Sequence, residues 1–160
     1  MVEILEGANI RVDAQKVIIK GPNGEVQKIF PKQAQVKIDG KNVDVIVDDF
    51  ALKGTLESLI NNMFIGVTKG YKRNFKILHA HFPASIEVKG TEILIKNFLG
   101  EKFPRKTRLI GPTKMEVKGQ NVTLSGPDKE SIGQTITNLR NALKIKKKDA
   151  RTFQDGIYEV

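Results

Sequence analysis

Residues 17–25 read VIIKGPNGE and residues 93–101 read ILIKNFLGE, two stretches 76 positions apart that share Ile, Lys, Gly and Glu in the same order. A second pair, VKIDGKNVDV at 36–45 and MEVKGQNVTL at 115–124, repeats at a spacing of 79. Similarity at a nearly constant spacing is typical of a duplicated structural unit. The sequence therefore predicts two copies of one fold, with a chance likeness between two hairpin-rich segments as the alternative.

Each copy has the pattern of strands followed by a helix. Apolar residues alternate around Gly40 in the first copy and around Gly119 in the second, as in β-hairpins with one buried face. Apolar residues then recur at helical spacing, ending at Val67 and at Leu143. Because such a helix must bury its stripe against a sheet, we predict an α+β protein with two tandem similar domains, each a small antiparallel sheet covered by one helix.

The predicted domains are residues 1–80 and 81–160. The join lies near Ala80 to Pro83, because proline disfavours helix at the residue before it. We expect the first domain to support the second or to contact other proteins, and the second to carry the binding function.

The composition excludes several classes of function. The 160 residues include no cysteine, which removes disulfides, thiolate metal sites and cysteine nucleophiles. No uncharged apolar run approaches the roughly 18 residues of a membrane span, and the N-terminus lacks the pattern of a signal peptide. We therefore expect a cytoplasmic protein that does not contact a membrane.

Candidate catalytic residues are few. His79 and His81 have no acidic ligand nearby in the sequence, and Asp48 and Asp49 precede a helix, where acids serve as caps. The stretch GVTKG at 66–70 lacks the spacing of a phosphate-binding loop. We expect no catalytic residue, metal, cofactor or small-molecule substrate, and hence a protein that is not an enzyme.

Positive charge gathers in the later part of the chain. The whole sequence has 27 Lys or Arg and 18 Asp or Glu, a net charge of +9. Residues 1–67 hold eight basic and nine acidic residues, whereas residues 68–160 hold nineteen and nine. Such asymmetry indicates a polyanionic partner for the second part, with a basic face kept for solubility as the alternative.

Three basic clusters interleaved with aromatic residues are the candidate binding sites. Lys and Arg neutralise phosphates, and aromatic rings stack on unpaired bases. Because no helix-turn-helix, zinc finger, RRM or KH pattern is present, we favour structured RNA recognised by shape. The residues predicted to bind RNA are Lys69, Lys72 and Arg73 in the first cluster, Lys102, Arg105, Lys106, Arg108 and Lys114 in the second, and Lys144, Lys146, Lys147, Lys148, Arg151, Phe153 and Tyr158 in the third.

The third cluster lies in a polar C-terminal tail, residues 143–158. We expect this tail to extend from the second domain and to become stable on a polyanion.

Several stretches resemble a known family. NNMFIGVTKGY at 61–71, AHFP at 80–83 and DARTFQDGIY at 149–158, together with the duplicated halves, resemble the sixth protein of the large ribosomal subunit, the universal L-six family. The most specific part is R-x-F-x-D-G-x-Y, from Arg151 to Tyr158. The chain ends at Val160 without the basic extension of eukaryotic relatives, so we expect the archaeal form.

The resemblance implies a structural role in the large ribosomal subunit. It further implies that the second domain binds ribosomal RNA near the sarcin–ricin loop, where translation factors dock, and that neighbouring ribosomal proteins are partners. The alternative is a free regulatory or chaperone-like protein that binds structured RNA without a fixed ribosomal site.

Overall fold

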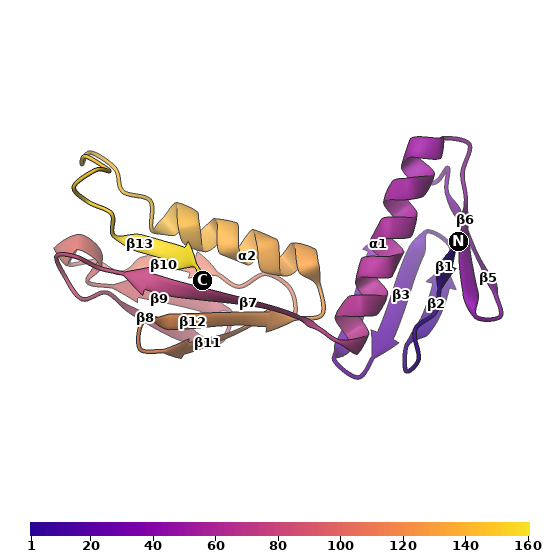
Figure 1. Ribbon diagram of the computed structural model, residues 1–160, viewed down its shortest axis with the longest axis horizontal. Coiled ribbons are helices and arrows are strands. Elements are labelled where there is room, and N and C mark those ends of the chain that lie inside the picture. The colour runs from indigo at the N-terminus through magenta and orange to yellow at the C-terminus, as the bar shows by residue number, and fades with distance from the viewer. The chain divides into compact units, whose positions relative to one another are not determined.

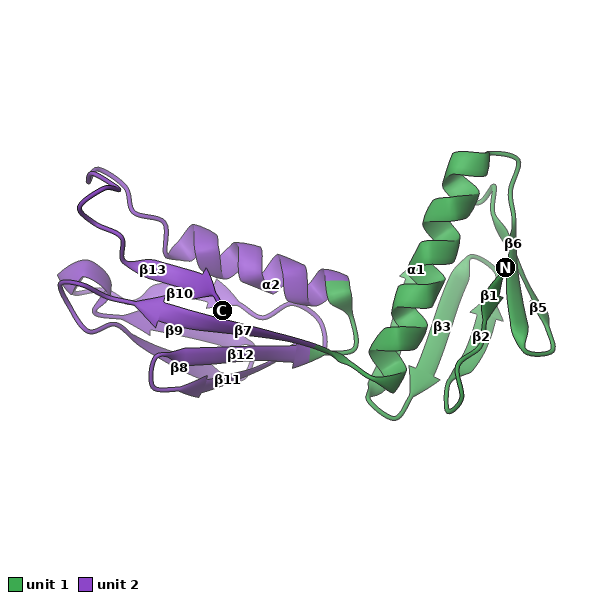
Figure 2. Cartoon of the chain, in the orientation of Figure 1, with its two compact units in different colours: residues 1–71, 126–129 green, residues 72–125, 130–160 purple.

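The computed structural model describes residues 1–160 and divides them into two compact units (Figure 2). Unit 1 comprises Met1–Tyr71 and Gly126–Lys129, and unit 2 comprises Lys72–Ser125 and Glu130–Val160. The division after Tyr71 differs from the expected join at 80/81. The reason is strand β7 (Tyr71–Leu78), which lies within the predicted first domain but pairs with strands of unit 2.

Unit 1 consists of two three-stranded antiparallel sheets and one helix, drawn in indigo to magenta in Figure 1. Its elements are β1 (Val2–Glu3), β2 (Asn9–Asp13), β3 (Lys16–Gly21), β4 (Gly24–Ile29), β5 (Gln35–Asp39), β6 (Asn42–Ile46) and α1 (Phe50–Thr68). The strand orders are β2-β3-β4 and β1-β6-β5.

Helix α1 closes the core of unit 1. Asp49 caps its first turn, because the carboxylate accepts a hydrogen bond of 2.9 Å from the backbone N–H of Ala51. The predicted apolar stripe is buried: Ile60 and Val67 have no exposed surface and pack with Ile19 of β3. Gly21 lies where a side chain would not fit, since a Cβ there would meet the carbonyl oxygen of Val67 at 2.6 Å.

Unit 2 has the same kinds of element and, in addition, a short 3₁₀ helix and a C-terminal strand. Its elements are β7, β8 (Ser85–Lys89), β9 (Glu92–Lys96), the short 3₁₀ helix η1 (Phe98–Gly100), β10 (Arg105–Arg108), β11 (Lys114–Lys118), β12 (Asn121–Gly126), α2 (Lys129–Ala142) and β13 (Gly156–Glu159). The strand orders are β10-β9-β8 and β11-β12-β7-β13.

The duplication predicted from the sequence is confirmed by this topology. The hairpins β2-β3-β4 and β8-β9-β10 correspond, and β1-β6-β5 corresponds to β7-β12-β11. The repeated isoleucines occupy equivalent positions, because Ile19 and Ile95 are 0% and 1% exposed on the central strands β3 and β9. The strands of each copy form two small sheets, and the α+β class with two similar units is as expected.

The C-terminal tail does not simply extend from unit 2. Strand β13 returns to the sheet and pairs antiparallel with β7, placing Ile157 opposite Ile77 and Tyr158 opposite Lys76. Ile157 is buried, so the end of the chain contributes to the core. The expectation of a tail that extends from unit 2 over 143–158 is therefore wrong for its last residues. Within this tail, only residues 143–155 have irregular backbone.

Candidate RNA-binding surface

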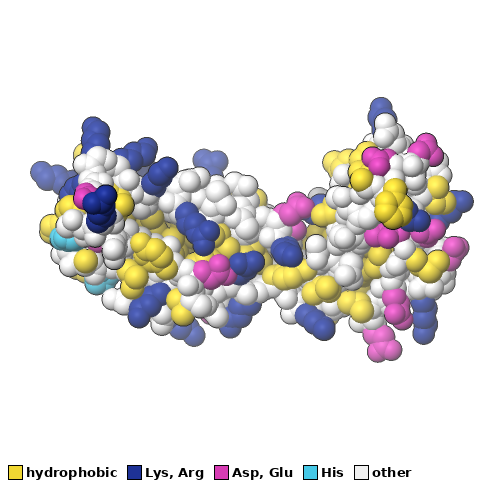
Figure 3. Space-filling model, turned by 45° about the horizontal axis from the view of Figure 1, so that its top comes forward, with side chains coloured by type: hydrophobic (Ala, Val, Ile, Leu, Met, Phe, Trp, Pro, Cys, Tyr) yellow, Lys and Arg dark blue, Asp and Glu magenta, His cyan; other side chains and the backbone are white.

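The two units differ in net charge. Unit 1 holds ten Lys or Arg and ten Asp or Glu residues, whereas unit 2 holds seventeen and eight. The whole excess of nine positive charges therefore lies in unit 2. On the face shown in Figure 3, dark-blue side chains gather over unit 2, whereas blue and magenta side chains are mixed over unit 1.

Most cations of unit 2 have no acidic partner. Four of its seventeen form ion pairs: Arg73, Lys96, Arg105 and Arg140. The other thirteen form none and are all exposed: Lys72, Lys76, Lys89, Lys102, Lys106, Arg108, Lys114, Lys118, Lys144, Lys146, Lys147, Lys148 and Arg151. Unit 2 therefore carries a positive charge that its own carboxylates do not neutralise.

The residues of the first predicted cluster separate in the structure. Lys69 ends helix α1 and belongs to unit 1, and its backbone N–H donates to the carbonyl of Ile65. Lys72 and Arg73 are neighbours on β7, so their side chains point to opposite faces of the sheet. Arg73 donates to Glu159 at 2.7 Å, whereas Lys72 is exposed and unpaired.

One face of the sheet β11-β12-β7-β13 is open and basic. Phe75 and Ile77 of β7 are buried, so Lys72 and Lys76 of the same strand point to the opposite, exposed face. On β11, Lys114 and Lys118 occupy the exposed positions of the alternation.

A hydrogen bond of 3.1 Å from Thr123 of β12 to Asn74 of β7 connects the two strands on this face, and Tyr158 lies on it beside Lys76. Glu116 is the only acidic residue of these four strands on this face, because Glu159 of β13 lies opposite Phe75 on the other face. Lys76, which belongs to the first basic cluster in the sequence, and Lys118 were not among the residues predicted to bind RNA, although the alternation of buried and exposed positions could have identified both.

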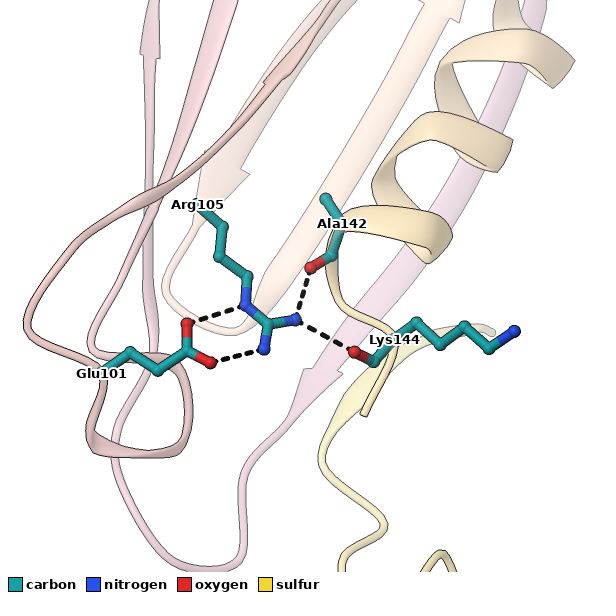
Figure 4. Close-up of polar contacts among 4 residues, drawn as sticks. All are labelled: Glu101, Arg105, Ala142 and Lys144. Atoms are coloured by element: carbon teal, nitrogen blue, oxygen red, sulfur yellow. Dashed lines mark hydrogen bonds and ion pairs between the residues drawn. The ribbon is translucent and has the colours of Figure 1, made fainter. Parts of the chain in front are cut away.

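Arg105 joins the second and third clusters (Figure 4). Its Nε donates to Glu101 Oε2 at 2.8 Å and its Nη2 to Glu101 Oε1 at 2.5 Å. Its Nη1 donates to the backbone carbonyls of Ala142 at 2.6 Å and Lys144 at 3.1 Å. We call this set of contacts the Arg105 clamp, and it connects the start of β10 to the end of α2 and the beginning of the basic tail.

The Arg105 clamp uses most of the hydrogen-bonding capacity of its guanidinium. Four of the five N–H donors of an arginine are engaged, and the group also lies 4.7 Å from the centre of the Phe98 ring. The hydrogen bonds between Glu101 and Arg105 lower the pKa of the Glu101 carboxyl and raise that of the guanidinium. The clamp positions the basic surface, and direct contact of Arg105 with RNA stays a prediction.

The third cluster contains a stack of side chains. The Phe153 ring contacts Lys148, whose Nζ is 4.4 Å from the ring centre, and stacks with His81, whose ring centre is 4.6 Å away. His81 Nδ1 is 3.5 Å from Oδ1 of Asp155, a side chain that is 1% exposed. These contacts hold the irregular tail against the segment that follows β7. Part of the Phe153 ring surface is therefore already covered by side chains of the same chain.

The structure places the remaining candidates as follows. Lys102, Lys106 and Arg108 lie exposed on the β9–β10 loop and on β10, and Lys146 and Lys147 lie exposed in the tail. Tyr158 is 45% exposed, with its hydroxyl donating to the Gln154 carbonyl at 2.8 Å.

Neither a metal-binding constellation nor a membrane-spanning helix is found. No three His, Asp or Glu side chains come together in a group that could hold a metal ion, and neither helix is long and apolar enough to cross a membrane.

Comparison with known proteins identifies the family. The family model described as Ribosomal protein L6 matches residues 82–156. Large ribosomal subunit protein uL6 of Methanobrevibacter smithii is 42% identical over 164 residues, which cover 98% of this chain and 92% of that protein. The chain belongs to the uL6 family. The uL6 proteins of Haloarcula marismortui and Sulfurisphaera tokodaii are 39% and 38% identical, each over 98% of this chain and over 91% and 88% of their own lengths.

The uL6 family model falls almost wholly within unit 2. Its matched range, 82–156, contains the Arg105 clamp and the candidate residues from Lys102 to Phe153. Lys69, Lys72, Arg73 and Tyr158 lie outside it. The relatives named above are similar along nearly the whole chain, so both units belong to the archaeal-type uL6 sequence.

Proposed function

We propose that this chain is a structural constituent of the large ribosomal subunit, located in the cytoplasm within the ribosome, and that unit 2 binds large-subunit ribosomal RNA. The observation that carries the proposal is the set of thirteen exposed cations in unit 2 that form no ion pair. Family membership supplies the identity of the polyanion, because the named relatives are large ribosomal subunit proteins.

The binding is electrostatic and shape-dependent. Each exposed Lys or Arg that neutralises a phosphate releases a condensed counterion, so affinity falls steeply with salt. The cations are distributed over the open face of β7 and β11, the β9–β10 loop and the tail. A distribution over several elements suits a folded RNA better than a helix that reads one groove.

Unit 1 has a different role in this proposal. Its basic and acidic residues are equal in number, so it gains little from a polyanion. We assign it to supporting unit 2 or to contacts with neighbouring ribosomal proteins. The resemblance to the family supports a position near the factor-binding region of the subunit.

A pair of charge reversals tests the RNA-binding role. Lys146→Glu with Lys147→Glu changes two exposed, unpaired cations of the tail and leaves Lys148 on the Phe153 ring. The control, Lys32→Glu with Lys41→Glu, makes the same charge change at two exposed lysines of unit 1. We expect the tail variant to bind protein-free large-subunit rRNA more weakly, with a salt slope reduced by roughly two, and the control to bind like the wild type.

Two results would contradict the proposal. Equal losses in the two variants would mean that net charge alone, and not the surface of unit 2, determines binding. Equal competition by unrelated structured RNAs would favour a free RNA-binding protein without a fixed ribosomal site.

A further inference from the structure

Phe103 is exposed in a way that folding of the chain does not explain. Its exposed fraction is 84%, whereas Phe64, Phe75 and Phe98 are all but fully buried. Leaving a phenylalanine in water forgoes roughly 2 kcal/mol of burial energy. Only Phe50, at 90%, is a more exposed phenylalanine in the chain.

The loop that carries Phe103 is fixed at both ends. Before it, Phe98 of η1 is buried, and Gly100 has a φ of +74° with the Phe82 ring against it, where a Cβ would come within 3.3 Å of the ring. After it, Arg105 is held by the Arg105 clamp. Because both ends of this short loop are held, the Phe103 ring is presented to the outside by anchored backbone.

The surroundings of Phe103 are positively charged. Lys102 and Lys106 are exposed and unpaired, and the nearest acidic residue in the sequence, Glu101, is engaged by Arg105. The Arg105 clamp also holds the loop to Lys144, the first cation of the tail. Phe50 is the opposite case, because it follows Asp48 and Asp49 in unit 1.

The other candidate aromatic residues of unit 2 are already engaged. The Phe153 ring contacts both Lys148 and His81, and the Tyr158 hydroxyl donates a hydrogen bond to the Gln154 carbonyl. Phe103 is not among the residues predicted from the sequence to bind RNA. In the structure it has the least covered aromatic ring of unit 2.

We propose that Phe103 stacks on an unpaired base of large-subunit rRNA. The proposal rests on the proposed RNA-binding function of unit 2 and assigns one residue to base contact. A phenylalanine ring surrounded by unpaired lysine side chains fits RNA, because the lysines can bind the phosphates on either side of a base that stacks on the ring. Protein interfaces, by contrast, are depleted of lysine around their aromatic anchors.

The absence of tryptophan from the sequence permits a direct test. Phe103→Trp places a single tryptophan at the proposed stacking position in the full chain, and Phe50→Trp places one at a similarly exposed position of unit 1. We expect protein-free large-subunit rRNA to quench the emission of Trp at position 103, and nuclease digestion to restore it. The Phe50→Trp emission should not change. The proposal would be overturned if rRNA bound to Phe103→Trp without changing its tryptophan emission, as expected for Phe50→Trp.

Affinity measurements separate stacking from a general apolar contact. Phe103→Ala and Phe103→Leu should both weaken rRNA binding roughly fivefold to hundredfold, whereas Phe103→Tyr should bind like the wild type, because only a ring can stack. The salt slope should stay unchanged in all three, since no charge is altered. The thermal unfolding midpoint should also stay unchanged, because the side chain is 84% exposed.

The outcomes distinguish this proposal from the one on which it rests. If the wild type does not bind rRNA, the proposed function fails. If the wild type binds and Phe103→Ala binds equally well, RNA binding stands and stacking is overturned. If Phe103→Ala keeps its rRNA affinity but is lost from subunits reconstituted with the other ribosomal proteins, Phe103 contacts a protein, and stacking is again overturned.

Discussion

Units 1 and 2 bury apolar residues at equivalent positions, but they differ in the balance of their charged side chains. Their central strands bury equivalent isoleucines, and each closes its core with one helix. Unit 1 balances ten cations with ten acids, whereas unit 2 leaves thirteen of seventeen cations without an ion pair. The comparison teaches that the buried positions preserve the fold of a duplicated unit, while the exposed positions are free to acquire a function.

The largest effect should come from the Arg105 clamp, which has no counterpart in unit 1. Arg105→Ala removes four hydrogen bonds and leaves the carbonyls of Ala142 and Lys144 without this donor. Because charge-assisted hydrogen bonds contribute about 1.5–3 kcal/mol each and are not additive, we expect unit 2 to lose about 3 kcal/mol of unfolding free energy. Amide hydrogen exchange in β9 and β3 measures the two units separately.

Arg105→Lys serves as the matched variant for this test. It retains the charge but lacks the planar fork that holds Glu101 with two nitrogens, so we expect an intermediate loss. Equal loss of protection in β3 and β9 would show that the two units unfold as one body, and the comparison between them would no longer hold for stability.

The sequence was sufficient to predict the fold but not the Arg105 clamp. Strand alternation and helical spacing are local patterns, so they located the hairpins β5-β6 and β11-β12 and the helices α1 and α2 correctly. Besides Glu101, the clamp acceptors are backbone carbonyls 37 and 39 positions from Arg105, and a backbone carbonyl has no signature in the sequence.

The return of the tail to the sheet was also beyond prediction. Strand β13 has only four residues, GIYE, and its pairing with β7 is a contact between distant parts of the chain. The charge pattern did locate the basic half of the molecule, because charge can be counted along the chain. Which individual cations touch RNA stays a prediction.

A smaller change in the free energy of unfolding, opposite in sign, should distinguish alanine substitutions at two glycines of unit 1. Gly21→Ala places a Cβ 2.6 Å from the carbonyl oxygen of Val67, and we expect a loss of about 1–3 kcal/mol through displacement of α1 from β3. Gly54 lies in α1 with nothing within 4 Å of an added Cβ, so Gly54→Ala should stabilise the protein by about 0.5–1 kcal/mol. Urea unfolding measures both changes.

The same pair sharpens the comparison between the units. Gly133 of α2 also has nothing within 4 Å of a Cβ, so Gly133→Ala should stabilise unit 2 as Gly54→Ala stabilises unit 1. None of the three changes alters charge, so their rRNA affinities should remain those of the wild type at temperatures where they are folded. A loss of affinity in Gly21→Ala alone, with unit 2 folded, would assign unit 1 a part in RNA binding.

The smallest effect should be an acid sensitivity of the Arg105 clamp. The hydrogen bond from Arg105 holds the pKa of Glu101 below its ordinary value of 4.5. Since the pKa is lower in the folded than in the unfolded chain, the stabilisation is present above pH 4.5 and is lost as the pH falls through the folded pKa. Because the Glu101 side chain is 40% exposed, solvent screening limits the contribution to under about 1 kcal/mol.

Urea unfolding of the wild type and of Glu101→Gln between pH 7 and pH 3 tests this sensitivity. The wild type should be the more stable at neutral pH, and the difference should shrink toward pH 3 as the Glu101 carboxylate is protonated. Glu87→Gln is the control, because the pKa of Glu87 is also lowered by a hydrogen bond, here from Lys96 on the other strand of the β8-β9 hairpin, and this bond lies outside the Arg105 clamp. A constant difference for Glu101→Gln across the whole range would mean that packing of this side chain, and not its charge, maintains the Arg105 clamp.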